Sequence, residues 1–197
     1  PLLGTPTIAV DLTDNSLFVT YEINKTGGDN EIRGISLDAN LNLVGAEVVL
    51  RTDEDPTNVN LDGDPLRQDT AALTGGGFVT VFDESDIFNS ATDRGIEFRL
   101  TTAAGANGAN ISVTGLDGIA DSNARVAALS DGGFVVVWVQ NEGSGPTLNN
   151  NILYRIYEAN GTARTAILTA ADSTNNHSGP DVIGLEDGTF FIVWEDN

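Results

Sequence analysis

The sequence predicts an all-β fold made of four-stranded antiparallel repeats of about 56 residues. A Gly- or Asp-containing turn followed by an apolar run with a closing aromatic residue occurs four times. The apolar runs are rich in β-branched residues, and no segment keeps a helical period. The closing aromatic residues are Tyr21, Phe82, Trp138 and Trp194, at spacings of 61, 56 and 56.

The third copy shows the expected order of strands most clearly. A short strand over 125–129 leads through a Ser-Asp-Gly-Gly turn into a continuous apolar strand over 134–138. A strand with alternating polarity follows over 152–157. After the turn at Asn160-Gly161, a fourth strand is expected over 163–168. Glycine suits these turns because it tolerates the positive φ that tight hairpins need.

The apolar second strand decides the architecture, because a strand that is apolar at every position has to be covered on both faces. A stack of sheets provides that cover, so the repeats are predicted to be β-propeller-like blades. A β-sandwich is the alternative, and the regular repeat weighs against it. We expect one repeat domain over 1–197, with full units 6–61, 65–117 and 121–173 and a half unit 177–197. The second-strand residues expected to be buried are Phe134, Val136 and Trp138, with their equivalents Phe78, Thr80, Phe82, Phe190, Ile192 and Trp194.

The net charge of the chain argues against two classes of binding partner. Nine Lys and Arg face 29 Asp and Glu, which gives a formal net charge of -20. Such a chain repels nucleic acid and anionic membranes, so neither is an expected partner. The sequence contains no cysteine and a single histidine, which excludes disulfides, thiolate metal sites and multi-His metal sites within one chain. No apolar run approaches the length of a membrane span.

The repeat also carries a resemblance. The run Leu-x-Asp-Gly-Gly-Phe-Val-Val-Val-Trp, followed by a polar loop and Ile-x-x-Arg-x-x-x-Ala-Asn-Gly, is similar to repeats of large secreted bacterial proteins of the RTX-related, hemolysin-type calcium-binding group. The match is good over 121–197, fair over 65–120 and weak over 1–60. The RTX nonapeptide itself is absent. The resemblance implies an extracellular location and an adhesive or structural role.

Acidic residues concentrate in the loops that join second to third strands and fourth to first strands, which share one face of a propeller. Calcium prefers six to eight oxygen ligands, so such loops are candidate calcium sites. The alternative is a solvated acidic face that keeps the protein soluble. The candidate ligands lie in two stretches and are Asp53, Asp55, Asp62, Asp64, Asp83 and Asp86. Calcium is the only cofactor that the sequence points to.

Catalysis is not expected from the sequence. His177 lies in a polar stretch and is expected to be a surface residue, although Asp172 and Ser178 are near it in the chain. No Gly-x-Ser-x-Gly motif is present, and among 29 acidic residues a pair of carboxylates arises by chance. Trp138 and Trp194 are expected to pack between blades rather than to stack on sugars. The sequence therefore predicts a protein that is not an enzyme.

The last apolar strand has no third or fourth strand after it, so its edge over 189–194 is expected to recruit another strand. A longer parent chain or self-association into filaments would cover this edge. Taken together, the sequence predicts an extracellular structural, adhesive or assembly-forming repeat module. The alternative is a calcium-dependent propeller that binds carbohydrate or another ligand, with glycans as partners.

Overall fold

The computed structural model describes residues 6–24, 30–52, 67–85, 94–115, 119–142, 149–172 and 175–197. It contains strands throughout and, within these residues, no helix. The strands are β1 (Thr7–Asp11), β2 (Ser16–Asn24), β3 (Asn30–Leu37), β4 (Leu43–Thr52), β5 (Gln68–Ala72), β6 (Phe78–Ser85), β7 (Arg94–Thr101), β8 (Asn107–Ser112), β9 (Ala120–Ala128), β10 (Phe134–Glu142), β11 (Asn149–Tyr157), β12 (Leu168–Ala171), β13 (His177–Gly184) and β14 (Phe190–Asp196).

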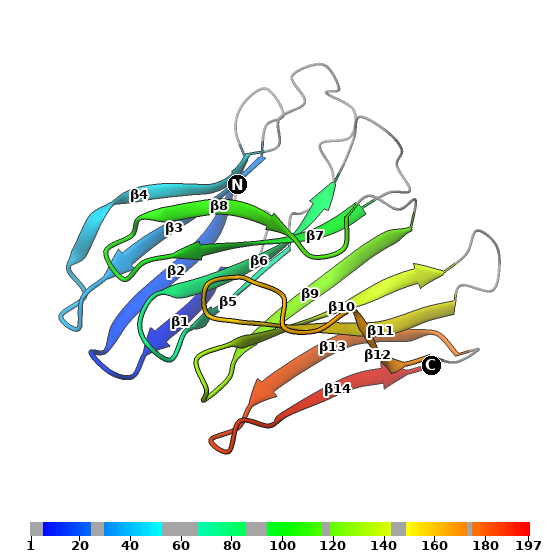
Figure 1. The fold of residues 1–197 in the computed structure, drawn as a ribbon. Coiled ribbons are helices and arrows are strands. Elements are labelled where there is room, and N and C mark those ends of the chain that lie inside the picture. Colours follow the sequence, from blue (N-terminus) through cyan, green and yellow to red (C-terminus); the bar gives the residue numbers. More distant parts are fainter. Residues whose placement is uncertain are drawn as a thin grey trace.

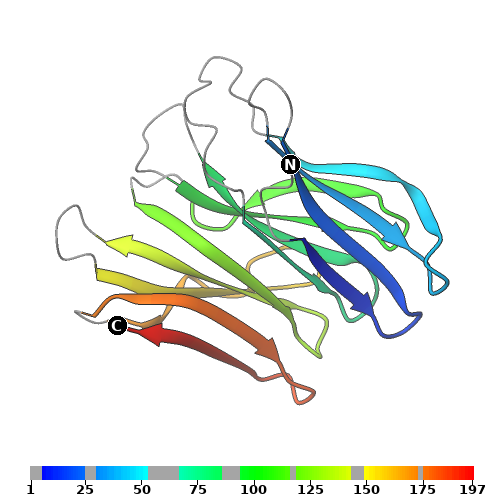
Figure 2. The same ribbon diagram turned by 180° about the vertical axis from the view of Figure 1, so that it is seen from behind.

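The strands form three four-stranded sheets and one hairpin, all antiparallel and in chain order. We call the sheet β1–β4 blade 1, the sheet β5–β8 blade 2 and the sheet β9–β12 blade 3, and we call β13–β14 the C-terminal hairpin. The sheets stand side by side in one row, with blade 1 and the C-terminal hairpin at its two ends (Figures 1 and 2). The prediction of four-stranded propeller-like blades, three full and one half, is confirmed.

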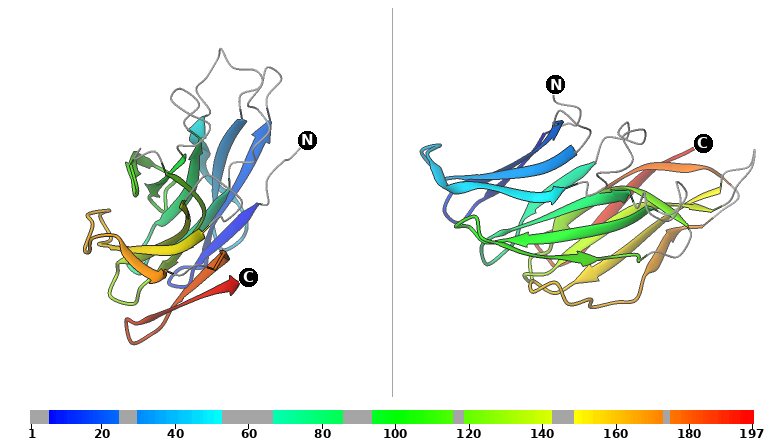
Figure 3. Two further views of the ribbon diagram at one scale, coloured as in Figure 1. Left: turned by 90° about the vertical axis from the view of Figure 1, so that its right-hand side faces the viewer. Right: turned by 90° about the horizontal axis from the view of Figure 1, so that it is seen from above.

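The first strands of successive units lie next to one another, β1 beside β5, β5 beside β9 and β9 beside β13, while later strands fan outward (Figure 3). Between the blades lie apolar layers. Phe18 of blade 1 stacks on Phe78 of blade 2 with ring centroids 5.2 Å apart, and Phe98 of blade 2 meets Phe134 of blade 3 edge-on at 5.1 Å. The core is thus a series of interfaces between blades, and each blade depends on its neighbours for burial.

The apolar second strand of blade 3 is buried on both faces, as the sequence predicts. Phe134, Val136 and Trp138 pack with the blade 2 side chains, whereas Val135 and Val137 belong to the layers that contact the C-terminal hairpin. All five side chains are 0% exposed. Phe78, Thr80 and Phe82 of blade 2 are also buried. The expectation is wrong for the C-terminal hairpin, where Phe190 and Ile192 are only half-buried and Trp194 is 38% exposed, because among the described strands β14 pairs with β13 alone.

The turns between first and second strands share one hydrogen-bond pattern. In blade 3 the amide of Leu129 donates to the carbonyl oxygen of Gly133, and the amide of Gly133 donates to the Asp131 carboxylate. The C-terminal hairpin repeats both bonds with Leu185, Thr189 and Asp187. Gly132 has a φ of 94°, which is why the Asp-Gly pair recurs at this turn.

A repeated arginine fastens blade 2 to blade 1 and blade 3 to blade 2. The guanidinium of Arg99 on β7 donates to the carbonyl oxygen of Val49 in blade 1 at 2.9 Å. Arg155 on β11 donates in the same way to Val113 in blade 2 at 3.2 Å. Ile35 occupies the corresponding position of blade 1. The two arginines that align in the sequence repeat are therefore ties between blades.

The fourth strand of blade 3 differs from its expected position. It was expected over 163–168, but β12 begins at Leu168, and only an isolated bridge joins Ala163 to Tyr157. The segment before β12 still bonds to β11, because the amide of Arg164 donates to the carbonyl oxygen of Ile156 at 2.8 Å. The Arg164 guanidinium pairs with Glu158 at 2.9 Å and with Asp131 at 2.7 Å across the turns.

Within the described part of the chain, no helix has the length and apolar character needed to cross a membrane.

Candidate functional site

The strand ends on one side of the molecule gather buried polar side chains. We call this side the loop face; β2, β6, β10 and β14 end there, and β3, β5, β7, β9, β11 and β13 begin there (Figure 1). The tight turns lie on the opposite side, the turn face. Every unit contributes buried polar residues at or near its loop-face end, namely Glu22, Glu31, Gln68, Asp121, Asn151 and His177. Buried polar groups are costly unless they are bonded, so a recurring row of them marks this face as the candidate site.

Asp83 is the one candidate calcium ligand that the structure describes. Asp53, Asp55, Asp62, Asp64 and Asp86 lie outside the described residues. The Asp83 carboxylate accepts the backbone amides of Asn123 at 3.1 Å and Ala124 at 3.3 Å. The described residues contain no group of three His, Cys, Asp or Glu that is arranged to hold a metal ion. In this structure Asp83 ties β6 to the first strand of the next blade.

A β-bulge in β9 creates the two amides that bind Asp83. The register of β9 against β10 shifts between Val137 and Val139, and Asn123 within the shift has a φ of 57°. A bulge of this kind turns successive amides toward one side of the strand, where they form a small anion-binding concavity. Burial raises the pKa of Asp83 to about 6, and the two amide bonds act against that rise.

Asp69 makes a second tie to the same strand. Its carboxylate accepts the amide of Val126 on β9 at 3.0 Å and the amide of Thr70 at 2.9 Å. Burial also raises the pKa of Asp69. Two carboxylates of blade 2 therefore fix the first strand of blade 3.

Asp121 and Asn151 form a polar row across the loop-face end of blade 3. Both residues pair with positions on β10, and the register places Asp121 and Asn151 on either side of Gln140. The indole nitrogen of Trp138 donates to the Asp121 carboxylate at 3.0 Å, so Asp121 caps the apolar layer that contains Trp138. The carbonyl oxygen of the Asn151 side chain is buried and accepts no hydrogen bond. Gln140 is half-buried between them and has a side chain suited to bind hydroxyl groups.

His177 is buried, which corrects the expectation that it is a surface residue. It begins β13, and its side chain is 5% exposed. Its ring lies 6.2 Å from that of Trp194 at a steep angle, and its Nδ1 lies 3.6 Å from a carboxylate oxygen of Asp196. The polar neighbours in sequence suggested a loop, but pairing with β14 brings the residue inside. The histidine joins the loop-face row from the fourth unit.

A small polar cavity lies between blades 1 and 2. Its volume is about 140 Å³, and it is lined by Val49, Leu50, Arg51, Thr52, Arg99 and Asn110. Arg51 pairs with Glu97 at 3.1 Å, and Asn110 donates to the same carboxylate at 3.0 Å. Burial lowers the pKa of Arg99. The hydrogen bonds of these side chains join the outer strands of two blades, which is a structural role.

No family model matches the chain, and no curated protein matches it. The predicted resemblance to RTX-related repeats therefore stays a prediction.

Solved structures share the fold at low identity. An α-L-arabinanase of Penicillium chrysogenum complexed with arabinobiose is 16% identical, with a TM-score of 0.58, over 91% of this chain and 53% of that one. The α-L-arabinofuranosidase Arb93A of Fusarium graminearum, with an iminosugar inhibitor, is 14% identical with a TM-score of 0.62, over 98% and 58%. A Synechocystis apocarotenoid oxygenase is 11% identical with a TM-score of 0.51, over 100% and 50%. The chain thus spans between 50% and 58% of the length of these three proteins.

These structures overturn one prediction. The sequence predicted that the protein is not an enzyme, because it shows no recognisable catalytic motif. That prediction is wrong, since three of the matching structures with this fold are enzymes by name, one an α-L-arabinanase and two an α-L-arabinofuranosidase. At these identities the likeness establishes the fold.

Proposed function

We propose that the loop face binds carbohydrate. The observation that supports this proposal is the row of buried polar side chains that all four units place at the same end of their strands. Carboxylates, amides and an imidazole next to aromatic rings match the chemistry of sugars, which offer hydroxyl groups and apolar ring faces. Two of the matching propellers hold arabinobiose in their structures. These findings favour the carbohydrate-binding alternative over a purely structural or adhesive module.

The charge of the chain selects among glycans. A formal net charge of -20 repels uronic acids and sulfated sugars. The row itself contains carboxylates and amides, which bind neutral hydroxyl groups without a charge conflict. Neutral oligosaccharides, with arabino-oligosaccharides first, are therefore the proposed ligands. The extracellular location that the repeat resemblance implies belongs to this proposal, because such polymers lie outside the cell.

The test is a titration of the full chain with neutral oligosaccharides, in which calorimetry measures the heat of binding. Gln140→Ala removes the half-buried amide between Asp121 and Asn151 and should weaken binding about tenfold. Glu158→Ala is the matched control, because Glu158 is exposed on the turn face. Binding that is equally strong in both variants would place the ligand elsewhere. No binding to any neutral glycan would refute the proposal.

Two further measurements test whether the loop face cleaves its ligand and whether the protein binds calcium. Release of reducing ends from a bound oligosaccharide would show that the protein cleaves its ligand, and unchanged oligosaccharide would show binding alone. Calcium dependence belongs to the proposal through the acidic stretches around Asp53–Asp64 and Asp83–Asp86. If they bind calcium, millimolar calcium should stabilise the fold by about 1–3 kcal/mol and chelator should reverse it. Identical melting curves in calcium and chelator would remove calcium from the proposal.

A further inference from the structure

The polar cavity between blades 1 and 2 has the opposite charge to the rest of the chain. The chain has a formal net charge of -20 and only nine Lys and Arg. Two of these nine, Arg51 on β4 and Arg99 on β7, line the cavity, and its described lining includes no carboxylate. The two guanidinium groups come from different blades. The cavity is therefore a locally positive site on a strongly acidic protein.

The Arg99 guanidinium has one nitrogen that binds nothing in the described part of the chain. Its Nε donates to the side-chain oxygen of Asn110 at 2.6 Å, and its Nη1 donates to the carbonyl oxygen of Val49 at 2.9 Å. Both acceptors are neutral, and Nη2 has no hydrogen-bond partner among the described residues. A half-buried cation with only neutral acceptors carries a desolvation cost that a bound anion would offset.

Blade 3 shows how the same arginine is stabilised without an anion. Arg155 aligns with Arg99 in the sequence repeat and also donates to two backbone carbonyl oxygens. Its guanidinium carbon lies 5.6 Å from the ring centroid of Tyr157, which gives a cation–π contact. The strand registers place Thr101 at the position of Tyr157 in blade 2. Arg99 therefore lacks the aromatic contact that Arg155 has, and it borders a cavity.

The charges around the cavity are only partly balanced. The Glu97 carboxylate pairs with Arg51 at 3.1 Å and accepts the side-chain amide of Asn110 at 3.0 Å, so it offsets one of the two guanidinium charges. Burial lowers the pKa of Arg99, the charge of Glu97 acts against this, and the charge of Arg51 lowers it further. The two arginines are thus close enough to repel each other. An anion between them would turn this repulsion into two attractions.

The size and lining of the cavity limit the kind of anion. Its volume is about 140 Å³. A water molecule takes about 30 Å³ in the liquid, so the cavity has room for a small ion and not for an oligosaccharide. The hydroxyl group of Thr52 and the amide of Asn110 also line it. Guanidinium groups bind carboxylate, sulfate and phosphate oxygens through charged hydrogen bonds, which favours an oxyanion over chloride.

We propose that this cavity binds a small oxyanion, which Arg99 holds through Nη2 and Thr52 through its hydroxyl group. The charge of the anion lies between Arg51 and Arg99. Strands β4 and β7 belong to different sheets, so no ladder of backbone hydrogen bonds joins them. The bound anion therefore adds a tie between blades 1 and 2, next to the bond from Arg99 to Val49. Because binding requires the folded interface, the anion stabilises the fold.

The test is thermal unfolding of the full chain in increasing phosphate, with sodium chloride of the same ionic strength as the reference. The reference is needed because any salt screens the repulsion within a chain of net charge -20. Phosphate at about 10 mM should raise the Tm by about 3–6 °C more than the chloride reference, and the rise should saturate. Sulfate and acetate are measured in parallel. A rise with phosphate and sulfate alone assigns a tetrahedral ion, and a rise with acetate as well extends the site to carboxylates.

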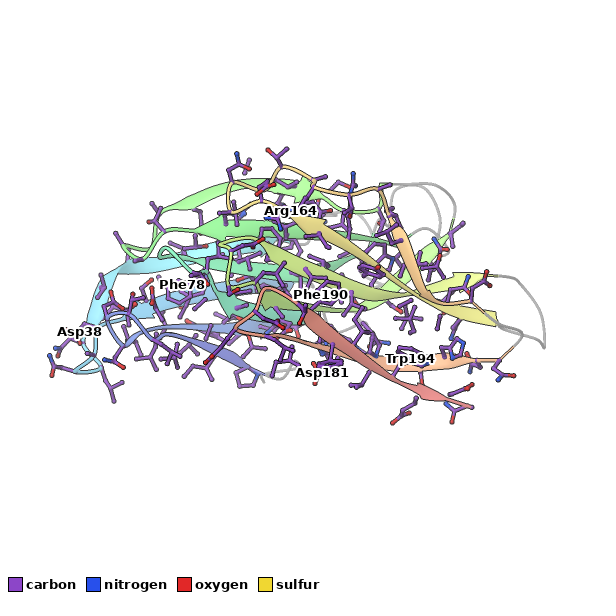
Figure 4. All side chains as sticks on the ribbon, turned by 60° about the horizontal axis from the view of Figure 1, so that its bottom comes forward. Asp38, Phe78, Arg164, Asp181, Phe190 and Trp194 are labelled. Atoms are coloured by element: carbon purple, nitrogen blue, oxygen red, sulfur yellow. The ribbon has the colours of Figure 1, made fainter. Side chains whose placement is uncertain are left out.

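Three chain variants locate the site. Arg99→Met removes the Nη2 donor and should abolish the phosphate-specific rise in Tm. Arg164→Met is the matched control, because it removes the same charge from a residue that pairs with Asp131 and Glu158 in blade 3, and it should keep the rise (Figure 4 labels Arg164). Thr52→Val removes the hydroxyl group and no bond between blades, so it tests the site even if Arg99→Met does not fold. It should weaken phosphate binding several-fold.

Circular dichroism shows which variants are folded. A rise in Tm no larger than that in chloride would overturn the proposal, because only screening would then act. Equal phosphate effects in Arg99→Met and Arg164→Met, or an unchanged phosphate affinity in Thr52→Val, would also overturn it. None of these outcomes depends on glycan binding at the loop face, because no sugar is present.

Discussion

Strands β10 and β14 carry nearly the same sequence and have different environments. Both follow an Asp-Gly turn, and both read as five apolar residues that close on tryptophan. Val135 and Val137 are 0% exposed, while their equivalents Phe191 and Val193 are 64% and 60% exposed. The difference lies in what stands beside each strand: β10 has a third strand at its edge and a sheet on each face, and β14 has one sheet and one neighbour. In a propeller, burial is therefore a property of position in the row, and the strand sequence alone does not determine it.

The largest expected effect contrasts the two tryptophans. Trp138→Ala should destabilise the fold by about 3–5 kcal/mol, because it empties a fully buried site and leaves Asp121 without the indole donor. Trp194→Ala should cost about 1 kcal/mol, since its side chain is already 38% exposed. Urea unfolding followed by circular dichroism measures both. Equal losses would mean that the two strands are buried alike.

The next effect concerns the carboxylate that fixes blade 3. Burial raises the pKa of Asp83 from 3.8 to about 6, so the folded protein binds a proton that the unfolded chain releases. Stability from this group is therefore present below about pH 4 and is lost as the pH rises through about 6. The stability of the native chain relative to Asp83→Asn should fall by about 2–3 kcal/mol over that range. Unfolding by urea at a series of pH values gives this difference, and a difference independent of pH contradicts the assigned burial.

A smaller effect separates two arginines of blade 3. Arg155→Met removes the bond to Val113 of blade 2 and should cost about 1–2 kcal/mol. Arg164→Met removes two ion pairs with half-exposed carboxylates and should cost about 0.5 kcal/mol or less. Thermal unfolding of both variants tests the order. A larger loss for Arg164 would show that the tie between blades contributes less than the turn-face ion pairs.

The smallest effect is expected on the exposed face of the hairpin. Phe191→Thr and Ile183→Thr change side chains that are 64% and 61% exposed, and each should alter the free energy of unfolding by about 0.5 kcal/mol or less. Both variants should also be more soluble, because they reduce an exposed apolar patch. A loss of more than about 1.5 kcal/mol in urea unfolding would show that this face is already covered in solution.

The hairpins and strands of each blade could be predicted from the sequence, because residues close together in the chain determine them. Turn residues such as Asp131 and Gly132, and the apolar run of β10, determine hairpins and strands over a few residues. Contacts between blades could not be predicted in this way, because they join residues that lie far apart in the chain. The burial of His177 depends on its pairing with β14, and the use of Asp83 depends on a bulge at Asn123, 40 residues further along the chain.

The candidate site shows the same limit. The acidic residues counted from the sequence fell largely on stretches outside the described residues, and the polar row of the loop face went unnoticed. Gln68 and Asn151 belong to that row and carry no motif, because each belongs to a different blade. The signal that would have found them is positional: a polar residue at the start of strands that are otherwise buried. Comparing the four units column by column reveals it.

Hydrogen exchange of the backbone amides tests the contrast between β10 and β14 most directly. In the monomeric chain, amides 134–138 should exchange far more slowly than amides 190–194, because alternate amides of β14 face the open edge. Equal protection of the two strands in the monomer would contradict the account, because it would show that β14 is buried as β10 is.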